Sequence, residues 1–336
     1  MKLIIQIPCY NEAETLAYTI EDLPRQVPGF SSVEILVIDD GSTDGTSAVA
    51  RGLGVDHVIR HSHNRGLATA FATGLDFALE LGADVIVNTD GDHQYRGESI
   101  PDLVAPLLRE EADMVVGNRQ VRSIAHFSRT KKVLQRLGTW VVRWVSGTDV
   151  DDATSGFRAF SREAALQLTI FTTYTYTLET LIQAGRKGLT VVSVLVATNE
   201  QLRESRLISS LPRYLMSSIF TILRIFLMYQ PLRVFSLLSM IPFTVGLMLL
   251  ARYAYFFALG EGAGHVQSVI VGSALGITAF LMFLLGLLSD LIARNRQLAE
   301  EVLYRVRRDR IGSIKSQIAG AERSKIGPGN TWRSDA

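Results

Sequence analysis

The sequence is poor in cysteine and has almost no net charge. Its 336 residues include one cysteine, Cys9, which excludes an internal disulfide and a zinc site built from several cysteines. The 34 Lys and Arg residues balance 33 Asp and Glu residues, so the formal net charge is +1 and gives no overall case for nucleic-acid binding. The low cysteine content favours a cytosolic location for the globular part of the chain.

Charge is also absent from two long stretches near the C-terminus. Val234–Ala251 and Val266–Leu288 contain no charged residue, and each is long enough to cross a hydrocarbon core of about 30 Å as a helix. A pair of buried core helices is the alternative, but uncharged runs of this length are unusual inside a modest soluble domain. We therefore predict a membrane part at residues 231–292, with spans at about 232–253 and 266–289.

The distribution of arginines predicts the orientation of this hairpin. Arginines cluster before the first run and after the second, whereas the connecting residues 254–265 contain neither Lys nor Arg. The positive-inside rule then predicts an integral membrane protein whose globular domain, residues 1–207, and C-terminus are both cytoplasmic. Residues 208–230 suit an amphipathic helix in the membrane surface, although a helix packed on the globular domain is the alternative. Residues 293–336 read as a basic tail, and 320–336 have the composition of a disordered end.

Short β-rich runs alternate with helical patterns throughout the globular domain. This alternation predicts an α/β fold with a mostly parallel sheet flanked by helices. The predicted strands are Leu3–Ile7, Val33–Asp39, His57–Arg60, Val85–Thr89 and Met114–Gly117. We expect His57–Arg60 to be an edge strand. Asn11 and Glu14 are spaced as a capping pair that opens a helix reaching about Leu23.

Polar and acidic clusters follow four of these strands. They are Pro8–Glu12, Asp39–Thr46, Asp90–Gln94 and Gly117–Arg119. The carboxyl ends of parallel strands meet at one edge of a sheet, where ligands bind. Carboxylates gathered there repel one another unless a cation or ligand joins them, and Mg²⁺ is usually held by one or two carboxylates plus substrate phosphates. An Asp-x-Asp at a strand end therefore indicates a metal–diphosphate site, although each cluster alone could be an ordinary turn or loop.

Together these clusters resemble the successive motifs of family 2 glycosyltransferases, which have the GT-A, Rossmann-like fold. Asp152–Arg158 and Ser205–Leu207 further resemble the branch that contains dolichyl-phosphate mannose synthase and the bacterial polyprenyl-phosphate sugar synthases. The resemblance implies a metal-dependent hexosyltransferase that uses Mg²⁺ or Mn²⁺. It would move a sugar with inversion from a UDP- or GDP-sugar to a membrane polyprenyl phosphate.

The resemblance also implies roles for individual residues. The nucleotide-sugar would be bound by Pro8, Tyr10, Glu12, Asp39, Asp40, Asp90 and Gly91. The metal ion would be held by Asp92 and Gln94. The catalytic set would be Asp92, Asp152, Arg119 and Arg129, with both arginines meeting phosphate. A phosphate acceptor has a second pKa of about 6 and is already ionised at neutral pH, so we expect Asp152 mainly to position it.

One position departs from the family pattern. Glu200 stands where some relatives have an arginine, so the acceptor-phosphate role is assigned to the nearby Arg203 and Arg206. These two residues could equally be positive charges that flank the membrane.

Other functions are compatible with the sequence. The acceptor could be a hydroxyl group in lipid-linked glycan or polysaccharide synthesis, although no Gln-x-x-Arg-Trp motif supports a processive synthase. A non-catalytic membrane scaffold is a further alternative, and the set of Asp90, Asp92 and Gln94 argues against it. A homo-oligomer is also compatible with the sequence.

Overall fold

The computed structural model describes residues 1–119, 139–140, 142–144, 146–170, 176–199, 224, 227 and 229–325, with side chains up to residue 313. These residues fall into two units, one containing Met1–Ser209 and Val302–Ala336 and the other Ser210–Glu301. The predicted site residues Arg129, Arg203 and Arg206 lie outside the described residues, as does most of the predicted surface helix at 208–230.

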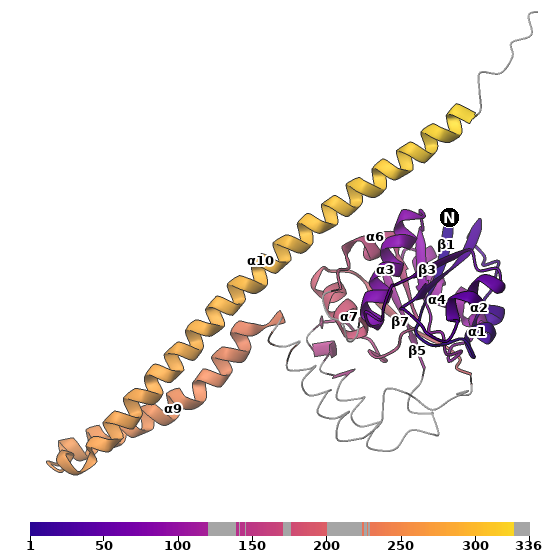
Figure 1. The fold of residues 1–336 in the computed structure, drawn as a ribbon. Coiled ribbons are helices and arrows are strands. Elements are labelled where there is room, and N and C mark those ends of the chain that lie inside the picture. The colour runs from indigo at the N-terminus through magenta and orange to yellow at the C-terminus, as the bar shows by residue number, and fades with distance from the viewer. Residues whose placement is uncertain are drawn as a thin grey trace, which may run out of the picture. The chain divides into compact units, whose positions relative to one another are not determined.

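Within the described part of the first unit, a seven-stranded sheet has the order β3-β2-β1-β4-β6-β5-β7, with helices on both sides (Figure 1). The strands are β1 (Lys2–Cys9), β2 (Ser32–Asp39), β3 (His57–Arg60), β4 (Val85–Asn88), β5 (Met114–Asn118), β6 (Arg158–Ser161) and β7 (Val191–Leu195). All neighbouring pairs are parallel except the two that involve β6. The prediction of a mostly parallel sheet is confirmed, and β3 lies at its edge.

The two faces of the sheet are covered by different helices. The helices of this unit are α1 (Leu16–Asp22), α2 (Thr46–Gly52), α3 (Leu67–Glu80), α4 (Ile100–Leu108), α6 (Arg162–Gln167) and α7 (Thr177–Arg186). Alternate residues Leu3, Ile5 and Ile7 of β1 are fully buried in one apolar core with α1, α2 and α4. On the other face Phe71 of α3 stacks on Tyr176, just before α7. Side chains of β1 are therefore buried on both faces of the sheet, as expected of a strand in a parallel sheet that helices cover on both sides.

The antiparallel strand β6 was not among the predicted strands. Its four residues, Arg-Ala-Phe-Ser, begin with a charged residue and contain no apolar run. It separates β4 from β5, because Arg158 pairs with Asn88 on one side and with Val116 on the other. Since β6 runs in the opposite direction, the loop before it begins at the edge where β4 and β5 end.

The predicted capping pair is wrong. Helix α1 begins at Leu16, with Thr15 as its N-cap residue. Asn11 has a positive φ of 54°, and its side-chain oxygen accepts a hydrogen bond from the backbone N–H of Thr43 at 2.9 Å. Asn11 thus joins two loops instead of opening a helix.

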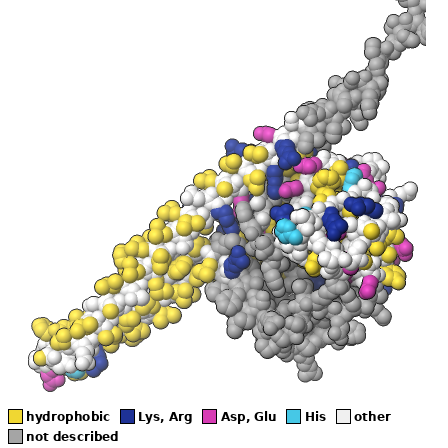
Figure 2. Space-filling model, in the orientation of Figure 1, with side chains coloured by type: hydrophobic (Ala, Val, Ile, Leu, Met, Phe, Trp, Pro, Cys, Tyr) yellow, Lys and Arg dark blue, Asp and Glu magenta, His cyan; other side chains and the backbone are white. Residues whose placement is uncertain are grey.

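The second unit contains α9 (Pro231–Ala258) and the first part of α10 (Val266–Lys325). Both helices are long and apolar enough to cross a membrane, yet only 11% and 17% of their most apolar windows are buried. Figure 2 shows hydrophobic side chains along this pair of helices. Such low burial argues against core helices of a soluble domain. The two helices approach closely at glycines, because a Cβ on Gly246 would lie 2.9 Å from the carbonyl oxygen of Gly272, as is common between membrane helices.

Helix α10 continues beyond its apolar part and reaches Lys325, into the stretch predicted to be disordered. Its later turns belong to the first unit. Arg307 lies 3.0 Å from Asp76 of α3 and donates to the carbonyl of Leu168 at 2.8 Å, and Arg310 lies 2.8 Å from Glu80. The segment that the sequence describes as a basic tail therefore packs on α3.

Candidate active site

Three of the predicted motifs meet at the carboxyl edge of the sheet. The loop after β1 is joined to the loop after β2 by a hydrogen bond from the backbone N–H of Glu12 to Thr46 Oγ1, at 3.0 Å. It is joined to the loop after β4 by a bond from Thr15 Oγ1 to the carbonyl of Gly91, at 2.9 Å. Loops that are far apart in the sequence therefore form one connected rim, as the parallel sheet predicted.

The two aspartates at the end of β2 are buried and fully engaged. Asp40 is 2% exposed and accepts hydrogen bonds from the backbone N–H groups of Arg65 and Gly66, at 2.9 and 2.8 Å. The Nδ1 atom of His61 lies 2.7 Å from the same carboxylate. Asp39 is 1% exposed and is likewise bonded by the loop that follows it. Both carboxylates hold the loop together, and a direct contact with a nucleoside stays a prediction.

The two aspartates after β4 have a different environment. Asp90 and Asp92 are half-buried, and neither has an ion-pair partner within the described part of the chain. Burial and the neighbouring Asp92 raise the pKa of Asp90 to about 7, although Arg119 acts in the opposite direction. Asp92 accepts one hydrogen bond, from the backbone N–H of Gln94 at 3.2 Å. Crowded carboxylates of this kind are stabilised by a cation.

The other residues predicted to bind the nucleotide-sugar lie at the end of β1 or close to it. Pro8 is buried within the strand, and Tyr10 is 42% exposed at its end. Glu12 accepts a hydrogen bond from Thr15 Oγ1 at 2.9 Å. Gly91 is required by close packing, because a Cβ there would lie 2.9 Å from the Sγ atom of Cys9. This contact ties the loop after β4 to the end of β1, and the role of Gly91 in binding the nucleotide-sugar stays a prediction.

Arg119 and Asp152 form a two-bond pair at the other side of the site. Nε and Nη2 of Arg119 donate to the two carboxylate oxygens of Asp152 at 2.7 and 3.0 Å, and Nη2 also donates to Thr154 at 2.9 Å. Burial acts to raise the pKa of Asp152, but the guanidinium of Arg119 holds it below its ordinary value. Asp152 is therefore ionised at neutral pH and is poorly suited to accept a proton.

Two residues that the sequence did not single out connect this pair to Asp90. The Tyr95 hydroxyl accepts a hydrogen bond from the backbone N–H of Gly156 at 3.1 Å. A Cβ on Gly156 would lie 2.9 Å from both carboxylate oxygens of Asp90. Tyr95 directly follows the Asp90–Gln94 motif and Gly156 lies within the Asp152–Arg158 motif, but neither was assigned a role, and only the fold shows that they touch. Asp90, Arg119 and Asp152 thus belong to one site.

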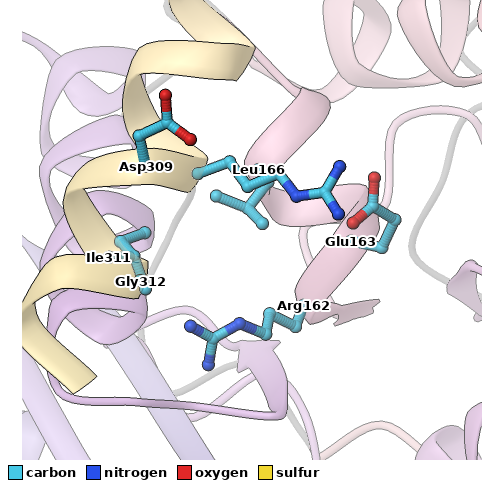
Figure 3. A pocket seen from close by; sticks show the side chains of 7 residues that line it. Arg162, Glu163, Leu166, Asp309, Ile311 and Gly312 are labelled. Atoms are coloured by element: carbon cyan, nitrogen blue, oxygen red, sulfur yellow. The ribbon is translucent and has the colours of Figure 1, made fainter. Parts of the chain in front are cut away.

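A separate pocket lies between α6 and the C-terminal part of α10 (Figure 3). Its lining residues are Arg162, Glu163, Leu166, Arg308, Asp309, Ile311 and Gly312. Because Ser161, at the end of β6, pairs with Val85 at the beginning of β4, α6 starts at the opposite edge of the sheet. This pocket is not part of the candidate active site, and its mixed charges favour no particular ligand.

Comparisons with known proteins agree with this geometry. Residues 4–168 match the family described as glycosyl transferase family 2. The UDP-N-acetylglucosamine–dolichyl-phosphate N-acetylglucosaminyltransferase of Methanococcus voltae is 30% identical, over 47% of this chain and 68% of the relative. The polyprenol monophosphomannose synthase of Mycolicibacterium smegmatis is 28% identical, over 60% of this chain and 78% of the relative.

Among solved structures, glucosyl-3-phosphoglycerate synthase from Mycobacterium tuberculosis has a TM-score of 0.53 at 21% identity, covering 66% of this chain and 79% of that one. A mostly parallel sheet of this kind, with an Asp-x-Asp loop at its carboxyl edge, defines a GT-A-like fold. The chain belongs to glycosyl transferase family 2.

Proposed function

We propose that this enzyme transfers a sugar, with inversion, from a UDP- or GDP-sugar to a polyprenyl phosphate at the cytoplasmic face of a membrane. The observation that carries the proposal is the juxtaposition of crowded carboxylates at Asp90 and Asp92 with the Arg119–Asp152 pair. The names of the relatives, which act on polyprenyl or dolichyl phosphates, support the same acceptor class.

The donor end of the site fits a divalent cation. Among the described residues, no three His, Cys, Asp or Glu side chains form a ready metal cage. Asp92 and Gln94 would supply two oxygen ligands, and the donor's diphosphate would supply others, which is the way proteins usually hold Mg²⁺. A bound Mg²⁺ or Mn²⁺ would neutralise charge on the leaving diphosphate.

The acceptor end of the site fits a phosphate. Within the described residues, the bonds of Arg119 to Asp152 and Thr154 use its Nε and Nη2 atoms, which leaves the Nη1 group to bind a phosphate oxygen. Asp152 orients the guanidinium, and its lowered pKa makes it a poor general base. An acceptor that is already ionised needs no such base, whereas a sugar hydroxyl would.

The second unit supports a lipid acceptor. Helices α9 and α10 expose most of their apolar surface, and the absence of Lys and Arg from residues 254–265, in contrast to the arginines on the other side of each apolar run, favours a cytoplasmic catalytic unit. A polyprenyl tail keeps its phosphate at the membrane surface. Tethering the enzyme to the same membrane raises the effective concentration of that phosphate.

The test is a panel of radiolabelled UDP- and GDP-sugars incubated with membranes containing the full-length protein and either undecaprenyl or dolichyl phosphate. We expect label in the lipid extract that depends on Mg²⁺ or Mn²⁺ and is abolished by a chelator. Membranes carrying Asp92→Ala are the matched control. Transfer only to a hydroxyl acceptor would contradict this proposal and favour a role in lipid-linked glycan or polysaccharide synthesis. Absence of any metal-dependent turnover of the donors would support the scaffold reading.

A further inference from the structure

Arg158 is a fully buried arginine at the beginning of β6, with an exposed fraction of 0%. It lies inside the sheet, where it pairs with Asn88 at the end of β4 and with Val116 in the middle of β5. Among the described residues, no carboxylate forms an ion pair with it, and its recorded partners are neutral oxygens. Burying a cation in this way is costly unless hydrogen bonds satisfy its donors.

Four hydrogen bonds hold the guanidinium in place. Nε donates to the carbonyl of Ser155 at 2.7 Å and Nη2 to the carbonyl of Ala153 at 2.8 Å. Nη1 donates to the carbonyl of Thr177 and to Thr180 Oγ1, both at 2.7 Å. Two of these acceptors lie in the loop before β6 and two lie in the first turn of α7. The side chain of Arg158 therefore fixes this loop against α7.

The loop that Arg158 holds touches both halves of the candidate site. At its beginning, Asp152 forms the two-bond pair with Arg119. At its end, Gly156 packs so tightly that a Cβ would lie 2.9 Å from both carboxylate oxygens of Asp90. Fixing the carbonyls between these two points fixes the spacing of Arg119 from Asp90.

We infer that Arg158 is a positioning residue that sets the distance between the acceptor-binding Arg119 and the donor-binding loop at Asp90. The inference rests on the proposed function, which assigns those two roles. Arg158 would contact neither substrate and would act only through backbone carbonyls. Small displacements of reacting groups lower the rate strongly, because a productive geometry requires the reacting atoms to be closely aligned.

The chemistry of arginine suits this role. Its planar fork directs donors toward several separate acceptors, whereas lysine presents one compact ammonium. Burial lowers the pKa of Arg158 to about 10, with Tyr176 and Asp152 acting in the opposite direction. The guanidinium therefore stays protonated at neutral pH and keeps all of its N–H donors.

The test compares Arg158→Lys with Arg162→Lys in the full-length membrane protein. Arg162 is a matched control, because it bonds a single carbonyl, that of Ala83 at 3.3 Å, at the other edge of the sheet. For Arg158→Lys we expect kcat to fall about tenfold or more and the KM for the lipid phosphate to rise about fivefold, with the KM for the donor unchanged. Arg162→Lys should keep wild-type values for all three.

The rise in the acceptor KM separates positioning from a merely structural role. Partial unfolding would lower the apparent kcat in proportion to the folded fraction and would leave both KM values unchanged. Thr180→Val offers a milder variant should Arg158→Lys fold poorly, since it removes one acceptor of Arg158 while keeping the shape of the side chain. We expect the same pattern from it at about threefold, the effect of one lost hydrogen bond.

Wild-type kinetics for the acceptor in both variants, or losses explained by the folded fraction alone, would overturn the inference. The proposed function is judged separately, from the product that the wild-type protein makes. If the wild-type protein uses a hydroxyl acceptor, the same comparison of kcat and KM on that acceptor still decides the role of Arg158.

Discussion

Two pairs of aspartates stand at the same edge of the sheet, and the protein treats them in opposite ways. Asp39 and Asp40 follow β2, are 1% and 2% exposed, and are bonded by backbone N–H groups of the surrounding loops. Asp90 and Asp92 follow β4, remain half-buried, and lie close enough together that the pKa of Asp90 is raised to about 7 by burial and by Asp92.

The difference shows that the supply of hydrogen-bond donors decides what an acidic motif does. A carboxylate whose oxygens already accept hydrogen bonds from its own chain stabilises the surrounding loops. A pair of carboxylates that lacks donors gains stability when a cation or an N–H-rich ligand arrives. Residue type and sheet edge are the same in both cases, so they do not separate a structural aspartate from one that would bind a ligand.

The largest expected effect comes from Asp92. Asp92→Ala removes a predicted metal ligand, so we expect sugar transfer to fall by about 10²–10³-fold, the size of a lost electrostatic contact at a reacting centre. The melting temperature should stay the same or rise, because Asp90 loses a like-charged neighbour. Radiolabelled transfer and thermal unfolding measure the two quantities. Asp102→Ala, at an exposed aspartate on α4, is the control. If Asp92→Ala keeps most of its activity, the functional difference drawn between the Asp39–Asp40 pair and the Asp90–Asp92 pair is wrong.

A second variant tests the pair formed by Asp39 and Asp40, which accepts hydrogen bonds from the surrounding loops. Asp40→Ala leaves the N–H groups of Arg65 and Gly66 and the ring of His61 without their acceptor. We expect the free energy of unfolding to fall by about 2–4 kcal/mol, because buried unsatisfied donors are costly. Denaturant unfolding of the detergent-solubilised protein measures the change. Weaker nucleotide binding with unchanged stability would instead mean that Asp40 serves the ligand directly.

Asp152 should show an intermediate effect. Asp152→Asn keeps the shape of the side chain and one acceptor oxygen for Arg119, so we expect turnover to fall about tenfold, the effect of weakening a charge-assisted pair. The loss should be clearly smaller than that of Asp92→Ala. Equal and nearly complete loss in the two variants would contradict a positioning role for Asp152.

The same pair predicts a pH dependence of stability. The pKa of Asp152 is lowered in the folded protein by Arg119, against the effect of burial. Its contribution to stability is therefore fully present above the unfolded carboxyl pKa of about 3.9 and is lost as the pH falls from there through the folded pKa. Thermal unfolding between pH 7 and pH 3, of wild type and Asp152→Asn, should show a shallower acid loss in the variant.

The smallest expected effect concerns an exposed acidic group that is paired with an arginine. Arg307 pairs with Asp76 at 3.0 Å on the surface of α3, and the Asp76 side chain is 50% exposed. A double-mutant cycle with Arg307→Ala and Asp76→Ala should give a coupling of about 0.5–1 kcal/mol that disappears in high salt. A larger, salt-insensitive coupling would place this pair with the buried carboxylates instead.

Much of the fold was accessible from the sequence because its signals are local. The apolar runs of β1, β2, β4 and β5 match strand periodicity, and the uncharged runs of α9 and α10 match the thickness of a membrane. The convergence of the motifs follows from parallel strands alone. These inferences need no knowledge of long-range contacts.

Strand β7 was missed although its Val-Val-Ser-Val-Leu run is a local strand pattern, whereas the other parts that escaped prediction depend on long-range contacts. The short strand β6 is stabilised by its neighbours β4 and β5 and not by its own composition. Arg158 is charged, and its burial follows only from the acceptors that the loop before β6 and the first turn of α7 provide. Asn11 matched a local capping pattern, but a partner in another loop determined its conformation.

The return of α10 to the first unit has a consequence for biosynthesis. The residues that bind Asp76 and Glu80 follow the apolar parts of α9 and α10 in the chain, so a ribosome makes them after the hairpin. The surface of α3 that they cover is therefore bare until the hairpin has been synthesised. The contacts of α10 with α3 can therefore form only after the hairpin has been made, and a nascent chain stalled within the hairpin would leave this acidic surface of α3 uncovered.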